Sequence, residues 1–156
     1  MSSVASTDLP SSQCDELPSA VDDHSKLNIL VLDDDFTCRT ALRQMITRLG
    51  HVTLEADTGL AALDVFKNAK PDILLLDIHM PEIDGIDFLI ALREAENEIP
   101  VITMSGGGPF PPGVALRSSL LLGARQALPK PFSGDELDLA IRAAIKPRTR
   151  QVRDAG

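Results

Sequence analysis

The chain has 156 residues, of which 44% are hydrophobic and 24% charged, and its formal net charge is −8 at pH 7. This length suits one globular domain, and the acidic balance argues against direct binding of nucleic acid, whose phosphates need Lys and Arg. No apolar run reaches the length of about 18–20 residues that a membrane helix needs, so we expect no membrane insertion. The two cysteines, Cys14 and Cys38, lie far apart in the sequence. That spacing argues against a disulfide framework and favours a cytoplasmic protein.

Composition divides the chain into three parts. Residues 1–26 are rich in Ser, Asp and Pro and show no sustained periodicity, which predicts a disordered leader without the features of a secretory signal. Residues 27–146 carry the regular patterns of a folded domain. Residues 147–156 form a short basic tail, which we expect to be solvated rather than bound to nucleic acid.

Within the central part, short apolar runs alternate with stretches of helical periodicity. The runs that predict buried strands are LNILVL (27–32), HVTLEA (51–56), DILLLD (72–77), PVITMS (100–105) and ARQAL (124–128). The stretches that predict helices are Phe36 to Leu49, Asp57 or Thr58 to Pro71, Ile86 to Leu92, VALRSSLLL (114–122) and SGDELDLAIRAAI (133–145). Five strands that alternate with five helices predict a parallel sheet with helices on both faces, in the α/β class.

Polar residues follow several of these strands directly. Asp33, Asp34 and Asp35 come after the first strand, and Asp77 ends the third. Ser105 ends the fourth strand, and Lys130 follows the fifth. The carboxyl ends of parallel strands border the ligand crevice of an open α/β sheet, so these groups are expected to converge although a hundred residues separate them.

Convergence of several carboxylates has an electrostatic cost. Two carboxylates about 5 Å apart repel by roughly 3 kcal/mol at an effective dielectric constant near 20. The cluster must therefore raise the pKa of one member or bind a cation. Oxygen ligands without His or Cys nearby suit a hard ion such as Mg²⁺. With a Lys and a Ser beside them, one carboxylate can act as a nucleophile towards a phosphoryl group.

These motifs resemble the receiver domain of two-component response regulators. The resemblance covers nearly all of Leu27 to Ile145 and rests on LVLDDD, DILLLDIHMPEIDG, VITMS and LPKPF, in that order. It implies a flavodoxin-like, doubly wound, five-stranded parallel sheet with strand order 2-1-3-4-5. It further implies that the chain accepts a phosphoryl group from a sensor histidine kinase or a histidine phosphotransfer protein. The chain would then catalyse only its own phosphorylation and dephosphorylation.

The resemblance also assigns roles to single residues. It makes Asp77 the phosphoacceptor, Asp34 a direct Mg²⁺ ligand and Asp33 a ligand mostly through coordinated water. Further roles fall on the remaining motif residues: the backbone carbonyl of His79 as a metal ligand, Ser105, Gly106 and Lys130 as phosphoryl-binding or switch groups, and a cis peptide before Pro131.

The sequence departs from the family at several positions. Ala127 stands where the family usually carries Tyr or Phe, which puts the usual coupling between a moving hydroxyl and a rotating ring in doubt. Ser105 replaces the commoner Thr but keeps the hydroxyl group. The glycines 106–108 open a loop that looks longer than usual, and they either cradle phosphate or give the loop flexibility. We therefore expect a remodelled output face beside an intact acceptor site.

About eleven residues follow the last helix, too few for an output domain, so the sequence predicts a stand-alone receiver that docks onto another protein or serves as a phosphorelay intermediate or phosphate sink. The leucines at 120–122 would place apolar surface near the usual partner face, and the expected state is a monomer or a weak dimer.

Two other functions compete with the prediction of a receiver. Asp33 to Thr37 fits the D-x-D-x-T motif of haloacid-dehalogenase-type phosphatases, but that reading leaves Asp77 unexplained. A pseudo-receiver without phosphorylation would have no need for clustered acids.

Some of these residues also have ordinary structural explanations. Asp35 is expected to cap the first helix rather than bind metal. Cys38 lies on the apolar stripe of that helix and is expected in the core, and Arg125 is expected at the surface. The His79 side chain either tunes the reaction or is simply exposed, and the sequence leaves both open.

Overall fold

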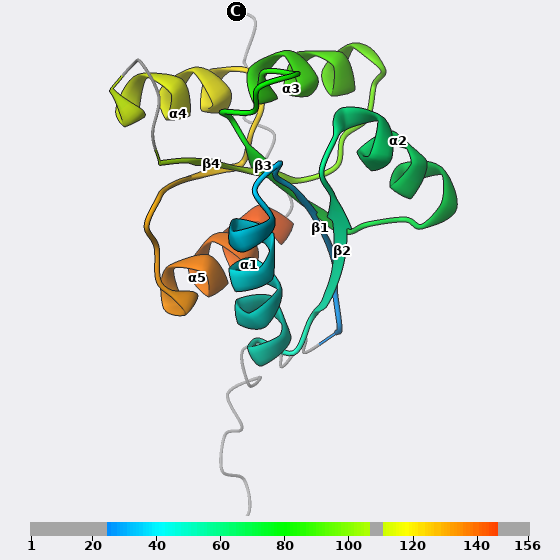
Figure 1. Ribbon diagram of the computed structural model, residues 1–156, viewed down its shortest axis with the longest axis vertical. Coiled ribbons are helices and arrows are strands. Elements are labelled where there is room, and N and C mark those ends of the chain that lie inside the picture. The colour runs from blue at the N-terminus through cyan, green and yellow to red at the C-terminus, as the bar shows by residue number, and fades with distance from the viewer. Residues whose placement is uncertain (1–24, 107–110, 147–156) are drawn as a thin grey trace, which may run out of the picture.

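The computed structural model describes residues 25–106 and 111–146 (Figure 1). Across these residues, five parallel strands form one sheet in the order β2-β1-β3-β4-β5, and five helices alternate with them. The strands are β1 (Asn28–Leu32), β2 (Val52–Ala56), β3 (Ile73–Asp77), β4 (Val101–Ser105) and β5 (Gln126–Pro129). The helices are α1 (Phe36–Arg48), α2 (Gly59–Asn68), α3 (Gly85–Glu94), α4 (Pro112–Leu121) and α5 (Gly134–Ile145). The predicted fold class and strand order are confirmed.

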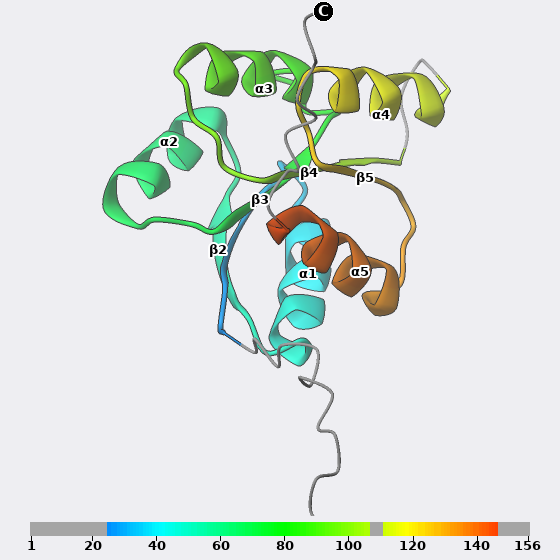
Figure 2. The same cartoon turned by 180° about the vertical axis from the view of Figure 1, so that it is seen from behind.

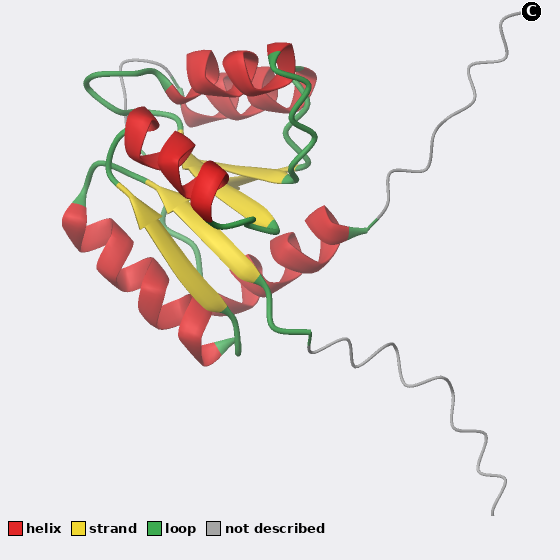
Figure 3. Ribbon diagram, turned by 90° about the vertical axis from the view of Figure 1, so that its right-hand side faces the viewer, coloured by secondary structure: helices red, strands yellow, loops and turns green. Residues whose placement is uncertain are grey.

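The sheet lies between two layers of helices. Helices α1 and α5 cover one face, and α2, α3 and α4 cover the other, as Figures 1 and 2 show from opposite sides and Figure 3 shows from the edge. Side chains alternate along each strand, so β1 sends Ile29 and Val31 towards α1 and α5 and sends Leu30 and Leu32 to the opposite face. Both faces of the central strands are thus buried, which explains their continuous apolar sequences.

Polar side chains cap the first turns of most of the helices. The Asp35 carboxylate accepts a hydrogen bond from the Thr37 N–H at 2.8 Å and caps α1, as predicted. At α2 the sequence left Asp57 and Thr58 open, and the structure shows that Thr58 is the cap. Helix α5 begins with a reciprocal capping box between Ser133 and Glu136. These caps set the points at which the chain leaves the carboxyl edge of the sheet.

The start of the last strand needs correction. This strand begins at Gln126 rather than at residue 124, because the Ala124 N–H donates to the Ser119 carbonyl and closes α4. Arg125, just before it, is partly exposed, and its guanidinium donates to the carbonyls of Ala144 and Lys146 at the end of α5. It thereby satisfies carbonyl groups that have no partner within the helix.

Several predictions fall on parts of the chain that the structure does not describe. They are the disordered leader, apart from Ser25 and Lys26, the basic tail, and the glycines at 107 and 108 with the loop that they open. Among the described residues, no helix is both long enough and apolar enough to cross a membrane.

Candidate functional site

The predicted site residues meet at the carboxyl edge of the sheet. Asp33 follows β1, Asp77 ends β3, Ser105 ends β4 and Lys130 follows β5. Asp77 is paired in register with Met104, so β3 and β4 end side by side. Strand order places β1 and β4 on either side of β3, which brings residues from four segments of the chain to one place.

Three carboxylates form the centre of this site. Asp33, Asp34 and Asp77 each offer an oxygen, and these oxygens lie within 4.8 Å of one another. Asp33 is fully buried and Asp77 is 6% exposed, whereas Asp34 is exposed to solvent. The cluster thus has a buried side and an open side, and a small ion or a phosphoryl group would reach it past Asp34.

Lys130 is the counter-ion of the cluster. Its ammonium nitrogen lies 3.0 Å from Asp33 Oδ2 and 3.7 Å from Asp77 Oδ1. The backbone N–H of Lys130 donates to the backbone carbonyl of Ser105 at 2.8 Å, which joins the end of β5 to the end of β4. The peptide bond from Lys130 to Pro131 is cis. One lysine thus faces two buried carboxylates.

Two carboxylates face one ammonium group, and the pKa values of Asp77 and Lys130 reflect this imbalance. The pKa of Asp77 is raised from 3.8 to about 6, chiefly by burial; the charge of Lys130 opposes this rise and the charge of Asp33 contributes to it. Burial lowers the pKa of Lys130, but the negative charges of Asp77 and Asp33 outweigh this effect and the net shift is upward. Lys130 therefore stays protonated, Asp77 keeps its proton up to about pH 6, and a second cation would favour the ionised form of Asp77.

The donor set fits a hard divalent cation. All three side chains offer carboxylate oxygens, which is the chemistry that Mg²⁺ and Ca²⁺ prefer. The nearest basic group, Lys130, contacts Asp33 and Asp77 and leaves the exposed Asp34 without that partner. Asp33, Asp34 and Asp77 are thus the residues that would hold such an ion.

Ser105 and Gly106 border the cluster on the β4 side. Ser105 is fully buried, and its hydroxyl oxygen has no hydrogen-bond partner among the described residues. An unsatisfied buried hydroxyl costs about 1–3 kcal/mol unless a ligand completes it. The hydroxyl thus has an open hydrogen-bonding capacity at the place where the resemblance puts the phosphoryl group.

Gly106 is required by the close approach of Lys130. A Cβ atom at residue 106 would lie 2.6 Å from the Cβ of Lys130. We expect Gly106→Ala to push Lys130 away from the carboxylates and to lower the free energy of unfolding by about 1 kcal/mol, as overpacking does. Urea denaturation measures the loss, and Gly134→Ala, whose Cβ meets no atom within 4 Å, is the control. Equal stability of the two variants would contradict the crowding argument.

His79 and Cys38 line a cavity of about 460 Å³ between α1 and the segment after β5. His79 is partly buried, and its Nε2 atom is inaccessible and has no hydrogen-bond partner in the described part of the chain. Its backbone N–H donates to Asp77 Oδ1 at 3.3 Å. Cys38 is only half buried, so the prediction of a core position is wrong. Its sulfur lies 4.0 Å from the Lys130 nitrogen, which keeps it at the edge of the site.

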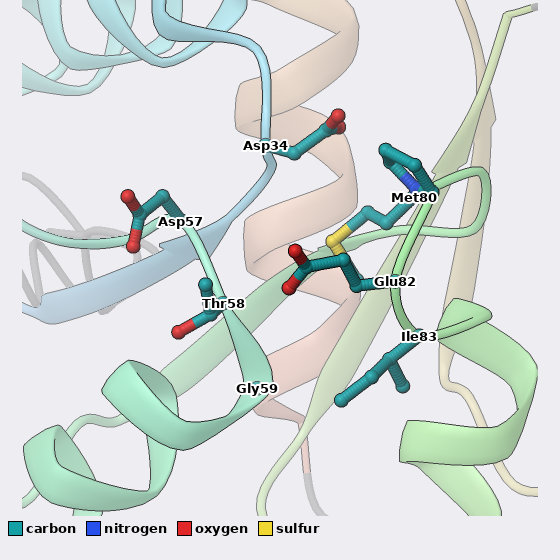
Figure 4. Close-up of a pocket in the computed structure, with 8 residues that line it drawn as sticks. Asp34, Asp57, Thr58, Gly59, Met80, Glu82 and Ile83 are labelled. Carbon is teal, nitrogen blue, oxygen red and sulfur yellow. The ribbon is translucent and has the colours of Figure 1, made fainter.

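A second hollow, of about 210 Å³, lies on the other side of Asp34. Figure 4 shows Met80 and Glu82 pointing from the loop after β3 into the space beside the loops that carry Asp34 and Asp57. Thr58 and Ile83 complete its wall. The open side of the carboxylate cluster is thus flanked by further acids, which makes this approach to the site strongly negative.

Three residues near the site were not singled out by the sequence. Arg39 donates to the backbone carbonyl of Asp33 at 2.8 Å. Thr103 and Ser119 form a buried hydroxyl–hydroxyl hydrogen bond of 2.6 Å between β4 and α4. Thr103 is paired in register with Ala127, so this polar contact lies beside the position at which the resembled family usually carries an aromatic ring. A polar residue in a mostly apolar strand was the available signal for Thr103, whereas the sequence carried no signal for the contacts of Arg39.

Known proteins are similar to this chain in both sequence and fold. The response regulator receiver domain family matches residues 29–142. Response regulator MprA of Mycobacterium avium is 35% identical over 129 residues, which are 83% of this chain and 55% of the relative. The chain thus spans about half the length of that curated relative.

Two solved structures give the same result. The receiver domain of the Francisella response regulator 1452 is 32% identical, with a TM-score of 0.66 over 77% of this chain and 95% of that one. NtrX from Brucella abortus is 29% identical, with a TM-score of 0.70 over 77% of this chain and 27% of that one. The chain therefore belongs to the response regulator receiver domain family of two-component signal transduction.

Proposed function

We propose that Asp77 accepts a phosphoryl group from the phosphohistidine of a sensor histidine kinase or a histidine phosphotransfer protein, with Mg²⁺ bound at the carboxylate cluster. The observation that carries the proposal is the convergence of Asp33, Asp34 and Asp77, whose oxygens lie within 4.8 Å, on a lysine 3.0–3.7 Å from two of them. A cluster of this charge has no structural use in a core, because it costs stability.

The reaction exchanges one bond to phosphorus for another. An oxygen of the Asp77 carboxylate attacks the phosphorus atom, the bond from phosphorus to the histidine nitrogen breaks, and the imidazole keeps the electron pair. In this step Lys130 would pair with one phosphoryl oxygen, and the Ser105 hydroxyl, which has no hydrogen-bond partner among the described residues, would donate to another. Water later hydrolyses the aspartyl phosphate. The chain then catalyses only its own phosphorylation and dephosphorylation, by positioning and charge neutralisation.

Mg²⁺ would be held by Asp33, Asp34, Asp77 and the backbone carbonyl of His79. When bound, it supplies positive charge against which the phosphoryl oxygens and the carboxylates can approach each other. Asp33 is fixed for this role, since one of its carboxylate oxygens accepts from the Asp35 N–H at 2.9 Å and the other from Lys130.

The competing phosphatase reading requires Asp33 as nucleophile and Asp35 as acid–base group. The Asp35 carboxylate caps α1 instead, and hydrogen bonding from the Thr37 N–H lowers its pKa, which disfavours a role as proton donor.

The phosphorelay or phosphate-sink role is favoured by one specific feature. Ala127 offers no ring to transmit a signal towards α4, so transfer onward of the phosphoryl group suits this chain.

Cellular context and assembly belong to the same proposal. We place the chain in the cytoplasm, where it docks onto another protein without binding nucleic acid itself. Leu120 and Leu121 expose 43% and 89% of their surface on α4, which suits a protein contact or a weak dimer on that side. That the receiver works without an attached output domain stays a prediction.

Intact-protein mass spectrometry tests the proposal directly. The wild type, incubated with a small-molecule phosphodonor and Mg²⁺, is expected to gain one phosphoryl group, and Asp77→Asn is expected to gain none. Asp35→Asn is the matched control, because Asn caps a helix as well as Asp and the residue lies outside the cluster. Chelation of the metal before the reaction is expected to prevent labelling of the wild type.

Two outcomes would contradict the proposal. A wild type that stays unmodified with phosphodonor and with a cognate kinase would favour a pseudo-receiver. Label that persists in Asp77→Asn but is lost in Asp33→Asn would favour the phosphatase.

A further inference from the structure

The backbone of Asp33 is held by a side chain from α1. Arg39 reaches back from the first turn of the helix and donates from Nη1 to the Asp33 carbonyl oxygen at 2.8 Å. The Arg39 side chain is only 14% exposed, so this bond is shielded from water. The bonded carbonyl belongs to the peptide unit that joins Asp33 to Asp34. Arg39 thus contacts the link between two of the three carboxylate residues.

Arg39 is itself held from two sides. Its Nε atom lies 3.7 Å from the Glu55 carboxylate on β2, and its guanidinium lies over the Phe36 ring at 5.7 Å from the centroid. Glu55 is paired in register with Val31, two residues before Asp33. The guanidinium therefore connects β2, α1 and the β1–α1 turn, and a planar fork with several donors is suited to such a connection.

The other polar atoms of Asp33 are satisfied as well. Its N–H donates to Ala56, one carboxylate oxygen accepts from the Asp35 N–H, and the other accepts from Lys130. Among the described hydrogen bonds of Asp33, only the one from Arg39 restrains its carbonyl group. This carbonyl belongs to the peptide unit that leads to the exposed Asp34. Without it, the direction of Asp34 relative to Asp33 would be less strictly set.

We propose that Arg39, anchored by Glu55, is a positioning residue that sets the geometry of Asp33 and Asp34 for a divalent cation. This inference rests on the proposed function, because it presupposes that the cluster binds a metal. Residues that orient metal ligands typically contribute about 10–100-fold to affinity.

The electrostatic effect of Arg39 has the opposite sign, which makes the inference testable. A positive charge near a cation site repels the cation, so replacing Arg39 by a neutral residue would tighten cation binding if charge alone mattered. A positioning role predicts weaker binding after the same change. The direction of the change in affinity therefore separates the two effects.

The experiment measures binding of Mn²⁺, as a paramagnetic probe of the divalent site, to the full chain by electron paramagnetic resonance of the free ion. Arg39→Gln is expected to raise the Kd for Mn²⁺ about tenfold. Arg43→Gln is the matched control, since Arg43 also pairs with Glu55, at 3.1 Å, from the same helix but has no bond to Asp33 among those described. Its Kd is expected to stay within twofold of the wild type. Thermal unfolding without metal shows whether each variant is folded.

Arg39→Lys provides a second variant if Arg39→Gln does not fold. It keeps the charge but cannot contact Glu55 and the Asp33 carbonyl together, so we expect a Kd about threefold higher than in the wild type. Arg39→Gln binding as tightly as the wild type, or more tightly, would overturn the positioning role, as would an equal loss in Arg43→Gln. If Arg39→Gln is unfolded, an unchanged Kd in Arg39→Lys would overturn it. A wild type that binds no Mn²⁺ would instead overturn the metal site of the proposed function.

Discussion

Lys130→Met is expected to lower the free energy of unfolding by about 3–5 kcal/mol at pH 7.5 in the absence of divalent cations. The carboxylate of Asp33 is fully buried and forms a salt bridge with Lys130 at 3.0 Å. Removing the ammonium group therefore leaves a buried negative charge without this partner. Met preserves most of the side-chain length and volume, so the loss reports the charge rather than a cavity. Urea denaturation with a far-ultraviolet circular dichroism readout measures the change.

Addition of Mg²⁺ is expected to restore part of this stability, because an ion that binds only the native state stabilises it according to its concentration and Kd. Lys67→Met is the control, since Lys67 is exposed on α2 away from the cluster, and it should change stability by less than about 0.5 kcal/mol. If Lys130→Met cost no more than Lys67→Met, water would have to reach the carboxylate of Asp33 in the native protein. The charge balance described for the site would then be wrong.

The position of the site could be predicted because it depends on topology. Asp77 and Lys130 are recognisable as polar residues at the ends of apolar strands, and in a parallel sheet these ends share one edge. The alternation of strands and helices was equally readable, since buried strands here are continuous apolar runs. Both inferences follow from the order of residues along the chain, without any knowledge of distances between atoms.

The contacts of Arg39 could not be read in the same way. In the sequence, Arg39 is one of several basic residues on the polar side of an amphipathic helix, a position that usually means exposure to solvent. Its role depends on Glu55, which reaches it only because β2 pairs with β1 in a register that puts Glu55 beside Val31. Spacing along one helix carries no information about that register.

The surroundings of Ala127 show a second limit. The missing ring was visible in the sequence, but the polar contact beside Ala127 was not. Thr103 lies opposite Ala127, and its hydroxyl bonds to Ser119 at 2.6 Å, while Ser119 also donates to the Leu116 carbonyl within α4. Ser and Thr each occur commonly in helices and strands, and only the packing of α4 on β4 shows that these two are partners. Helix α4 is thus joined to the strand that ends in Ser105 by a polar bond.

Asp77→Asn is expected to be more stable than the wild type by about 2 kcal/mol at pH 7.5 without divalent cations. Burial raises the pKa of Asp77 from 3.8 to about 6, which corresponds to an upper bound of about 3 kcal/mol, and solvent screening reduces this value. Between these two pH values the native protein binds more protons at Asp77 than the unfolded chain does. The wild type therefore loses stability as the pH rises through this window, whereas the Asn variant does not have this loss.

Denaturation curves of both proteins between pH 3 and pH 7.5 measure the effect. The difference should be smallest near pH 3, where the carboxyl is mostly protonated in both states, and should approach its full value above about pH 6.5. Saturating Mg²⁺ should reduce it, because ion binding stabilises the wild type, which keeps all three carboxylates, more than the variant. A difference that is independent of pH would mean that Asn is favoured for its packing. A difference that follows the predicted window would mean that the acceptor carboxylate is kept at a cost in stability, as expected of a group retained for chemistry.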